Sequence, residues 1–153
     1  MTHVTRAALP AVVDATKALA HPGRLRILAM LRGEDLCVCQ MTAVLGLAAS
    51  TVSSHLGDLR RAGFVSERKI GKWVRYHLVG EGALADMAGQ ALRLAAADDQ
   101  LKNDLRTVRA LRKISLDTLC STGFDLLAVD AAPTRVRRRP ARPHARLTAG
   151  SRR

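Results

Sequence analysis

The sequence predicts a mainly α-helical fold with one small β-hairpin. Two stretches with helical periodicity, from about Gln40 to Leu45 and from about Ser50 to Ala62, are separated only by a tight turn at Gly46-Leu47. Two β-favouring runs, 64–70 and 73–79, then flank Gly71-Lys72, which is typical of a hairpin. Two short helices joined by a Gly-containing turn form a helix-turn-helix, and a hairpin directly after it is a candidate wing. The predicted class is a winged helix-turn-helix.

Two further helices are expected before this unit. Pro10 suits the first turn of a helix that ends near Leu19, because the missing N–H of proline would have no partner there. His21-Pro22-Gly23 interrupts that helix, and His21 is expected to have a structural role. A second apolar helix follows over 25–31, and Gly33 is expected to end it in a left-handed conformation.

Beyond Gly82, two amphipathic helices are expected, one with Leu84 and Leu92 on its apolar face and one with Leu101 and Leu111. Apolar faces on peripheral helices need a partner surface. The predicted organisation is a winged helix-turn-helix core with an N-terminal helix over 1–80, C-terminal helices over 81–130, and a basic disordered tail over 131–153.

The charge of the chain favours an acidic polymer as partner, but most of that charge lies in the tail. The sequence has 25 Lys and Arg against 13 Asp and Glu, a formal net charge of +12. Eight arginines follow Asp130 with no acidic residue among them, which leaves +4 on residues 1–130. Specific DNA binding must therefore be argued from motifs, and the tail is assigned an auxiliary electrostatic role.

Four stretches of the sequence carry a resemblance to a known family. Residues 34–41 read Glu-Asp-Leu-Cys-Val-Cys-Gln-Met, and residues 51–56 read Thr-Val-Ser-Ser-His-Leu. Residues 21–28 (His-Pro-Gly-Arg-Leu-Arg-Ile-Leu) and 71–76 (Gly-Lys-Trp-Val-Arg-Tyr) belong to the same pattern. In this order they resemble the ArsR/SmtB family of metal-sensing repressors. The resemblance implies a winged-helix homodimer, joined through its terminal helices, that leaves its operator when an effector binds. It assigns DNA binding to the core over 1–80 and dimerisation to the N-terminal helix of that core and to the C-terminal helices over 81–130.

The chain departs from that family at two places. Arsenic-sensing members with a Cys-Val-Cys motif carry a third cysteine five positions after the first, where this chain has Thr42, and Gln40 replaces the acidic residue nearby. Zinc-sensing members use an Asp-x-His pair on the last helix, whereas residues 82–120 contain no histidine. A local three-thiolate site and that zinc site are both missing.

The helix over about 50–62 is expected to read DNA. An α-helix fits the major groove, where hydroxyl and imidazole groups reach base edges while Lys and Arg contact phosphates. Ser and Thr can also simply cap and solvate a helix, with Val52, Leu56 and Leu59 as its core stripe; the neighbouring wing favours DNA binding. Trp73 is expected to be a core anchor. The predicted DNA-contacting residues are Ser50, Thr51, Ser53, Ser54, His55, Arg60, Arg61, Arg68, Lys69, Lys72 and Arg75.

The effector is expected to be a soft ion held by cysteine thiolates. Thiolates favour As(III), Sb(III), Cd(II), Pb(II), Hg(II) or Cu(I) over hard cations. Residues two apart in a regular helix point about 200° apart, so Cys37 and Cys39 close on one ion only if the helix start distorts. The predicted site is Cys37, Cys39 and Cys120, within one chain or across the dimer, with As(III) or Sb(III) as effector and Cd(II) or Pb(II) as alternatives. A site of Cys37 and Cys39 alone would suit a monomethylated arsenical or Hg(II).

Other functions stay open at this point. A thiol redox or persulfide sensor would join Cys37 or Cys39 to Cys120 without a metal. A thiol-based enzyme is disfavoured, because no acid–base pair and no Gly-rich cofactor loop accompany the cysteines. An architectural protein driven by the arginine tail is the third alternative. No secretion leader or long apolar run is visible, so a cytoplasmic protein without membrane contact is expected.

Overall fold

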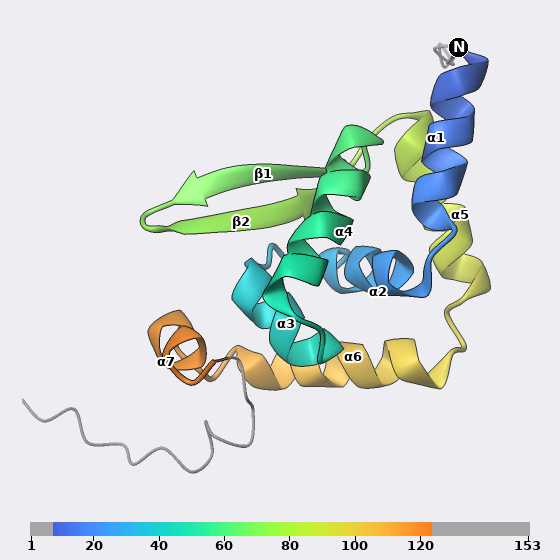
Figure 1. Cartoon of the computed structure of the whole chain (residues 1–153). Coiled ribbons are helices and arrows are strands. Elements are labelled where there is room, and N and C mark those ends of the chain that lie inside the picture. Colours follow the sequence, from blue (N-terminus) through green and yellow to red (C-terminus); the bar gives the residue numbers. More distant parts are fainter. Residues whose placement is uncertain (1–7, 124–153) are drawn as a thin grey trace, which may run out of the picture.

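A computed structural model describes residues 8–123, which form seven helices and one antiparallel hairpin (Figure 1). The predicted tail over 131–153 lies outside the described residues. No helix among residues 8–123 is long and apolar enough to cross a membrane. In chain order the elements are α1 (Leu9–Leu19), α2 (Pro22–Leu31), α3 (Val38–Leu45), α4 (Ala49–Arg61), β1 (Val65–Ile70), β2 (Trp73–Leu78), α5 (Ala83–Leu94), α6 (Asp99–Leu111) and α7 (Leu116–Ser121).

The core lies between α2, α3 and α4, the predicted helix-turn-helix and the helix before it. Ile27 and Leu28 of α2, Met41 of α3 and Leu56 of α4 are at most 1% exposed. Phe64, which follows α4, closes the same cluster at the base of the hairpin. The winged helix-turn-helix predicted from the sequence is therefore the observed fold.

The chain's turns follow from local chemistry. His21 caps α2, because its Nδ1 accepts a hydrogen bond of 3.0 Å from the N–H of Gly23. Gly46 ends α3 with a φ of 65°, and Gly71 turns the hairpin with a φ of 60°, a region that residues with a Cβ resist. The expectation for Gly33 is wrong: it is not among the glycines with positive φ, because α2 closes through Arg32 in a right-handed conformation.

The hairpin pairs Val65 with Leu78 and Ile70 with Trp73 in an unbroken antiparallel register. Trp73 is only partly buried and lies outside the core cluster, so its predicted role as a core anchor is wrong; it is the first residue of β2, directly after the hairpin turn. At the other end of the hairpin, Leu36 forms a β-bridge with Tyr76. The segment that leads into α3 is thereby attached to the wing.

The C-terminal helices cover the core of their own chain. Figure 1 shows α6 running beneath α2 and α3, with which it packs, and α7 beside α3. Leu101 and Leu111 of α6 are buried within the single chain. Apolar side chains stay exposed on α1, at Leu9, Val12 and Val13, and at the end of α5, at Leu94. The sequence did not predict α7 as a separate helix.

Candidate nucleic-acid interface and thiol site

Helix α4 separates an apolar face from a hydroxyl-rich face. Val52, Leu56 and Leu59 are at most 1% exposed and fix the helix on the core. The predicted base-reading side chains lie on the remaining surface: Ser50, Thr51, Ser53 and Ser54 are exposed and His55 is half-buried. The structure thus places the five together on the outer side of α4, as a groove-reading helix requires.

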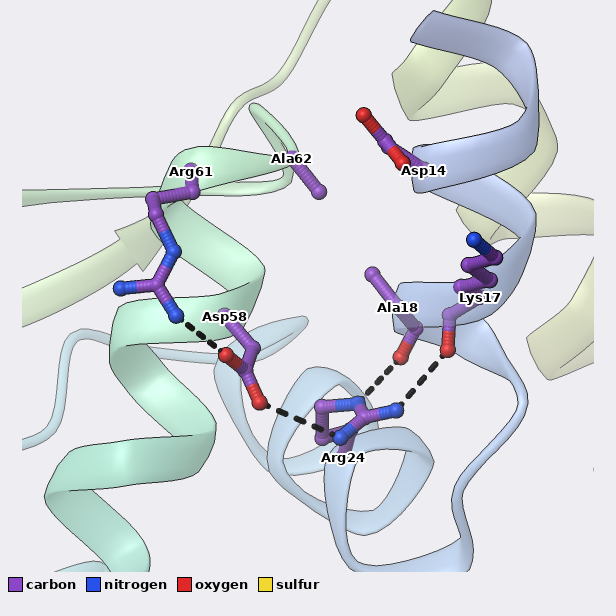
Figure 2. Close-up of a pocket in the computed structure, with 7 residues that line it drawn as sticks. All are labelled: Asp14, Lys17, Ala18, Arg24, Asp58, Arg61 and Ala62. Carbon is purple, nitrogen blue, oxygen red and sulfur yellow. Dashed lines mark hydrogen bonds and ion pairs between the residues drawn. The ribbon is translucent and has the colours of Figure 1, made fainter. Parts of the chain in front are cut away.

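Arg24 fixes the position of α4 against α1 and α2. Its guanidinium donates to the backbone carbonyl oxygens of Ala18, at 2.5 Å, and Lys17, at 2.8 Å, and it lies 3.3 Å from a carboxylate oxygen of Asp58 on α4 (Figure 2). Asp58 also accepts from Arg61. These groups line a cavity of about 310 Å³ between α1 and α4. Asp58 thus pairs with both Arg24 and Arg61. Arg61, one of the predicted DNA-contacting residues, therefore already has an acidic partner within the chain.

His55 is held against the start of α2. Its ring centroid lies 4.4 Å from that of His21, and a Cβ at Gly23 would come within 3.2 Å of the His55 Nε2 atom. Burial, followed by the nearby His21 and Arg24, lowers the pKa of His55 below its ordinary value. His55 is therefore a neutral imidazole near pH 7, able to donate to and accept from a base edge.

The cations of the wing divide between two faces of the hairpin. Arg68 lies opposite Arg75 in the register, so both side chains share one face, while Lys69 lies on the other face with Glu67. Glu67 pairs with Arg60 of α4 at 2.6 Å, which identifies the Lys69 face as the one beside the reading helix. Among residues 8–123, Lys69 is the predicted wing cation with neither an ion pair nor a side-chain hydrogen bond, whereas Arg68 and Lys72 form ion pairs and Arg75 donates to a backbone carbonyl.

The opposite face of the hairpin meets the segment before α3. Arg68 pairs with the carboxylate of Asp35, and Arg75 donates to the Asp35 carbonyl oxygen at 3.1 Å. Lys72, at the hairpin turn, pairs with Asp117 of α7. Three of the predicted DNA-contacting cations are thus engaged with the two parts of the chain that carry the cysteines.

Cys39 and Cys120 are joined by a disulfide that links α3 to α7, with the two Cα atoms 6.0 Å apart. Cys37 is the N-cap of α3, is 2% exposed and stays free; its N–H donates to the Gln40 side-chain oxygen at 3.0 Å. The structure therefore brings together two of the three predicted ligands. Within the described part of the chain, no group of three or more His, Cys, Asp or Glu side chains is arranged to hold a metal ion.

Sequence reasoning missed several residues at these sites. Asp35 and Asp117 have no motif of their own, and only the fold places them against the wing. Gln40 was noted as a departure from an acidic residue, and its amide instead caps α3. Thr42 occupies the other departure: it is 6% exposed, and its hydroxyl has no hydrogen-bond partner among the described residues.

Comparison with known proteins gives one family and a consistent set of relatives. The model of the family described as "Bacterial regulatory protein, arsR family" matches residues 21–67. A putative arsenical resistance operon repressor of Halobacterium salinarum is 40% identical over 77 residues, 49% of this chain and 60% of that protein. The cadmium resistance transcriptional regulatory protein CadC of Listeria innocua is 34% identical over 70 residues, 45% of this chain and 59% of that protein. The match therefore spans about three-fifths of each relative.

A solved structure extends the likeness to the fold. The homodimeric winged helix-turn-helix DNA-binding domain of Mb0332 from Mycobacterium bovis, described as a possible ArsR-family transcriptional regulator, is 30% identical, with a TM-score of 0.51. The likeness covers 67% of this chain and 92% of that domain. These relatives are transcriptional regulators and not enzymes, in agreement with the prediction from the sequence.

Proposed function

Because the chain belongs to the arsR family of bacterial regulatory proteins, we propose that it is a homodimeric transcriptional repressor of double-stranded operator DNA. The observation that carries the proposal is α4, whose hydroxyl-rich face is exposed beside a hairpin while its apolar stripe is buried. In a dimer, two such helices enter successive major grooves, and Lys69 and Arg60 contact the adjacent backbone. The exposed apolar face of α1, with Leu9, Val12 and Val13, is the surface that joins the two copies.

The proposed effector is a thiophilic metalloid, As(III) or Sb(III), with Cd(II) or Pb(II) as alternatives. Cys39 and Cys120 fit such an ion once both are thiols, since their sulfur atoms are already adjacent. Cys37 lies in the same segment and would supply a third thiolate if the first turn of α3 opens. The names of the arsenical and cadmium resistance relatives support this class of effector. A bound ion would link α3 to α7 and weaken the hold on DNA.

A second candidate is a thiol redox sensor, which the Cys39–Cys120 disulfide favours. In that case hydrogen peroxide accepts two electrons and two protons from the two thiols, which gives one disulfide and two molecules of water. The disulfide then takes the place of the ion as the link between α3 and α7. Cys37, buried as the α3 N-cap, is left as a structural residue.

Fluorescence anisotropy of a labelled duplex separates these functions. The duplex is selected from a random pool by the fully reduced protein, and arsenite, antimonite, Cd(II), Pb(II) or hydrogen peroxide is then added. For the metalloid sensor, arsenite or antimonite releases the duplex under strictly reducing conditions. For the redox sensor, peroxide releases it and arsenite does not. Failure of the reduced protein to select any sequence would overturn the repressor function.

Three single variants assign the ligands. Cys39→Ser and Cys120→Ser are each expected to abolish release by either agent, because each removes one end of the link between α3 and α7. Cys37→Ser is the matched control for the disulfide mechanism, since it changes a cysteine two residues away that forms no bond in the structure. Loss of the arsenite response in Cys37→Ser, with the peroxide response retained, would assign Cys37 as the third ligand.

A further inference from the structure

The contact between α7 and the hairpin turn has no part in the function proposed so far. Asp117, in the first turn of α7, forms an ion pair with Lys72, the residue directly after the hairpin glycine. Cys120 lies three residues further along the same short helix and is bonded to Cys39. Helix α7 therefore holds the wing with one side chain and the start of α3 with another.

On the basis of the proposed DNA-binding function, we propose that α7 is an acidic strap: when Cys120 is linked to Cys39, Asp117 competes with DNA phosphate for Lys72 and draws the wing away from the operator. A carboxylate and a phosphate seek the same ammonium group, so Lys72 serves one or the other. Asp117 acts here as a positioning residue, because it touches the wing and not the DNA.

The link between Cys39 and Cys120 strengthens the ion pair between Asp117 and Lys72, which is weak by itself. Both partners are exposed, with Lys72 at 66% and Asp117 at 69%, and an exposed pair is weak in water. A tether three residues away keeps Asp117 beside the hairpin turn and raises its local concentration there. When Cys39 and Cys120 are not linked, only the weak ion pair remains, and DNA phosphates then displace Asp117 from Lys72.

Further contacts support the strap by fixing the segment over 34–37, which precedes α3. Arg68 and Arg75 of the hairpin are held by Asp35, which lies two residues before Cys37. Arg112, at the end of α6, binds Glu34 with nitrogen–oxygen distances of 2.9 and 3.1 Å. The segment over 34–37 is thus fixed between the wing and the helix that leads to α7, so that linking Cys39 to Cys120 tightens one connected assembly.

Either thiol chemistry would close the strap. Hydrogen peroxide takes two electrons and two protons from the Cys39 and Cys120 thiols, forms the S–S bond and leaves as two water molecules. A thiophilic ion bound by both thiolates makes the same connection without oxidation. The strap therefore does not depend on which of the two agents is the effector.

The test compares wild type with Asp117→Asn in reduced and peroxide-oxidised forms, by anisotropy of the selected duplex over a range of salt concentrations. Oxidation of wild type should lower affinity and reduce the slope of log K against log[salt] by about 0.9 per wing, the loss of one phosphate contact. Oxidised Asp117→Asn should bind about two- to fivefold more tightly per wing than oxidised wild type, the range for an exposed ion pair, and should regain the slope. Equal affinities for the two oxidised proteins would overturn the strap.

Asp99→Asn is the matched control, because Asp99 is an exposed aspartate paired with a lysine on α6, at 3.3 Å from Lys102. It removes the same charge, so any gain it shares with Asp117→Asn is a general charge effect and counts against the strap. A zero-length carbodiimide crosslink between Lys72 and Asp117, mapped by mass spectrometry, gives a readout without DNA. It is expected in the oxidised protein and should fall when duplex is added; its absence from the oxidised protein would overturn the contact, whether or not the repressor function holds.

Discussion

At the scale of single residues, Asp104 is the buried charge on which the attachment of α6 depends. It is 1% exposed, and its carboxylate accepts from Arg26 at 2.6 and 2.8 Å and from Gln100 at 2.8 Å. The hydrogen bond to Asp104, against the opposing effect of burial, raises the pKa of Arg26. The pair joins α2 to a helix that begins some seventy positions later in the sequence.

Asp104→Ala should lower the free energy of unfolding by about 3 kcal/mol, because it leaves the Arg26 guanidinium without its partner. Arg26 is 21% exposed, so water offsets part of the loss and the value falls at the low end for buried pairs. Urea denaturation gives the measurement, and Asp99→Ala, at an exposed position of the same helix, should change it by less than about 0.5 kcal/mol. A cost for Asp104→Ala as small as that of the control would show that the pair does not hold α6.

His55 makes stability depend on pH in a defined direction. Its pKa is lowered in the folded protein, chiefly by burial, so the unfolded chain takes up a proton first as the pH falls through about 6.5. The folded state therefore loses stability below that pH until the lowered pKa is reached. The urea midpoint of wild type should fall more between pH 7.5 and 5.5 than that of His55→Asn. Parallel pH profiles would contradict the assignment.

At the scale of elements, Gly63 determines how the wing leaves α4. Its φ of +85° is left-handed, and a Cβ there would lie 2.9 Å from Leu84 Cδ1 on α5. Gly63→Ala should cost at least about 1–2 kcal/mol, from the backbone alone. Gly33→Ala is the control, because nothing lies within 4 Å of its added Cβ and its φ is not positive; it should be neutral or stabilising by up to about 1 kcal/mol. Similar losses in urea denaturation for the two variants would contradict this distinction.

The two glycines also show how much of the fold can be predicted from the sequence. Apolar periodicity located α2 and α4, and the two β-favouring runs around Gly71-Lys72 located both strands, each within one to three residues. Conformation at one glycine depends on how the next element approaches, so Gly63 and Gly33 look alike in sequence and differ in structure. Helix α7 has too few turns to show a period and is held by Cys120, so periodicity could not identify it.

The candidate site was predictable to the same extent. The exposed face of α4 follows from its own periodicity, and Ser50, Thr51, Ser53, Ser54 and His55 lie outside its buried stripe, as that periodicity predicts. The link between Cys39 and Cys120 spans 81 positions, and only the packing of α6 across α3 brings them together. For the same reason, no local pattern indicated that Asp35 and Asp117 would pair with cations of the wing.

At the scale of the whole molecule, the exposed face of α1 is the surface proposed to join two copies of the chain. Leu9 is 76% exposed, Val12 43% and Val13 41%, although the adjacent Ala15 and Ala18 are buried against the core. Val12→Asp should convert the proposed dimer to monomer in sedimentation equilibrium, because it buries an unpaired carboxylate at the interface. Val74→Asp, the same change at a 42% exposed position of the hairpin, should leave the dimer intact. A dimeric Val12→Asp would move the interface away from α1.

The β-bridge between Leu36 and Tyr76 means that the wing does not move independently of the segment that leads into α3. The N–H of Leu36 donates to the Tyr76 carbonyl at 3.1 Å, and the N–H of Tyr76 returns a bond to Leu36 at 2.8 Å. These two reciprocal hydrogen bonds attach the segment that contains Leu36 and leads to Cys37 to the sheet as a very short third strand. Hairpin and thiol segment should accordingly open as one cooperative unit, with a shared rate of amide exchange, so that a chemical event at the sulfur atoms is transmitted to the wing through the backbone itself.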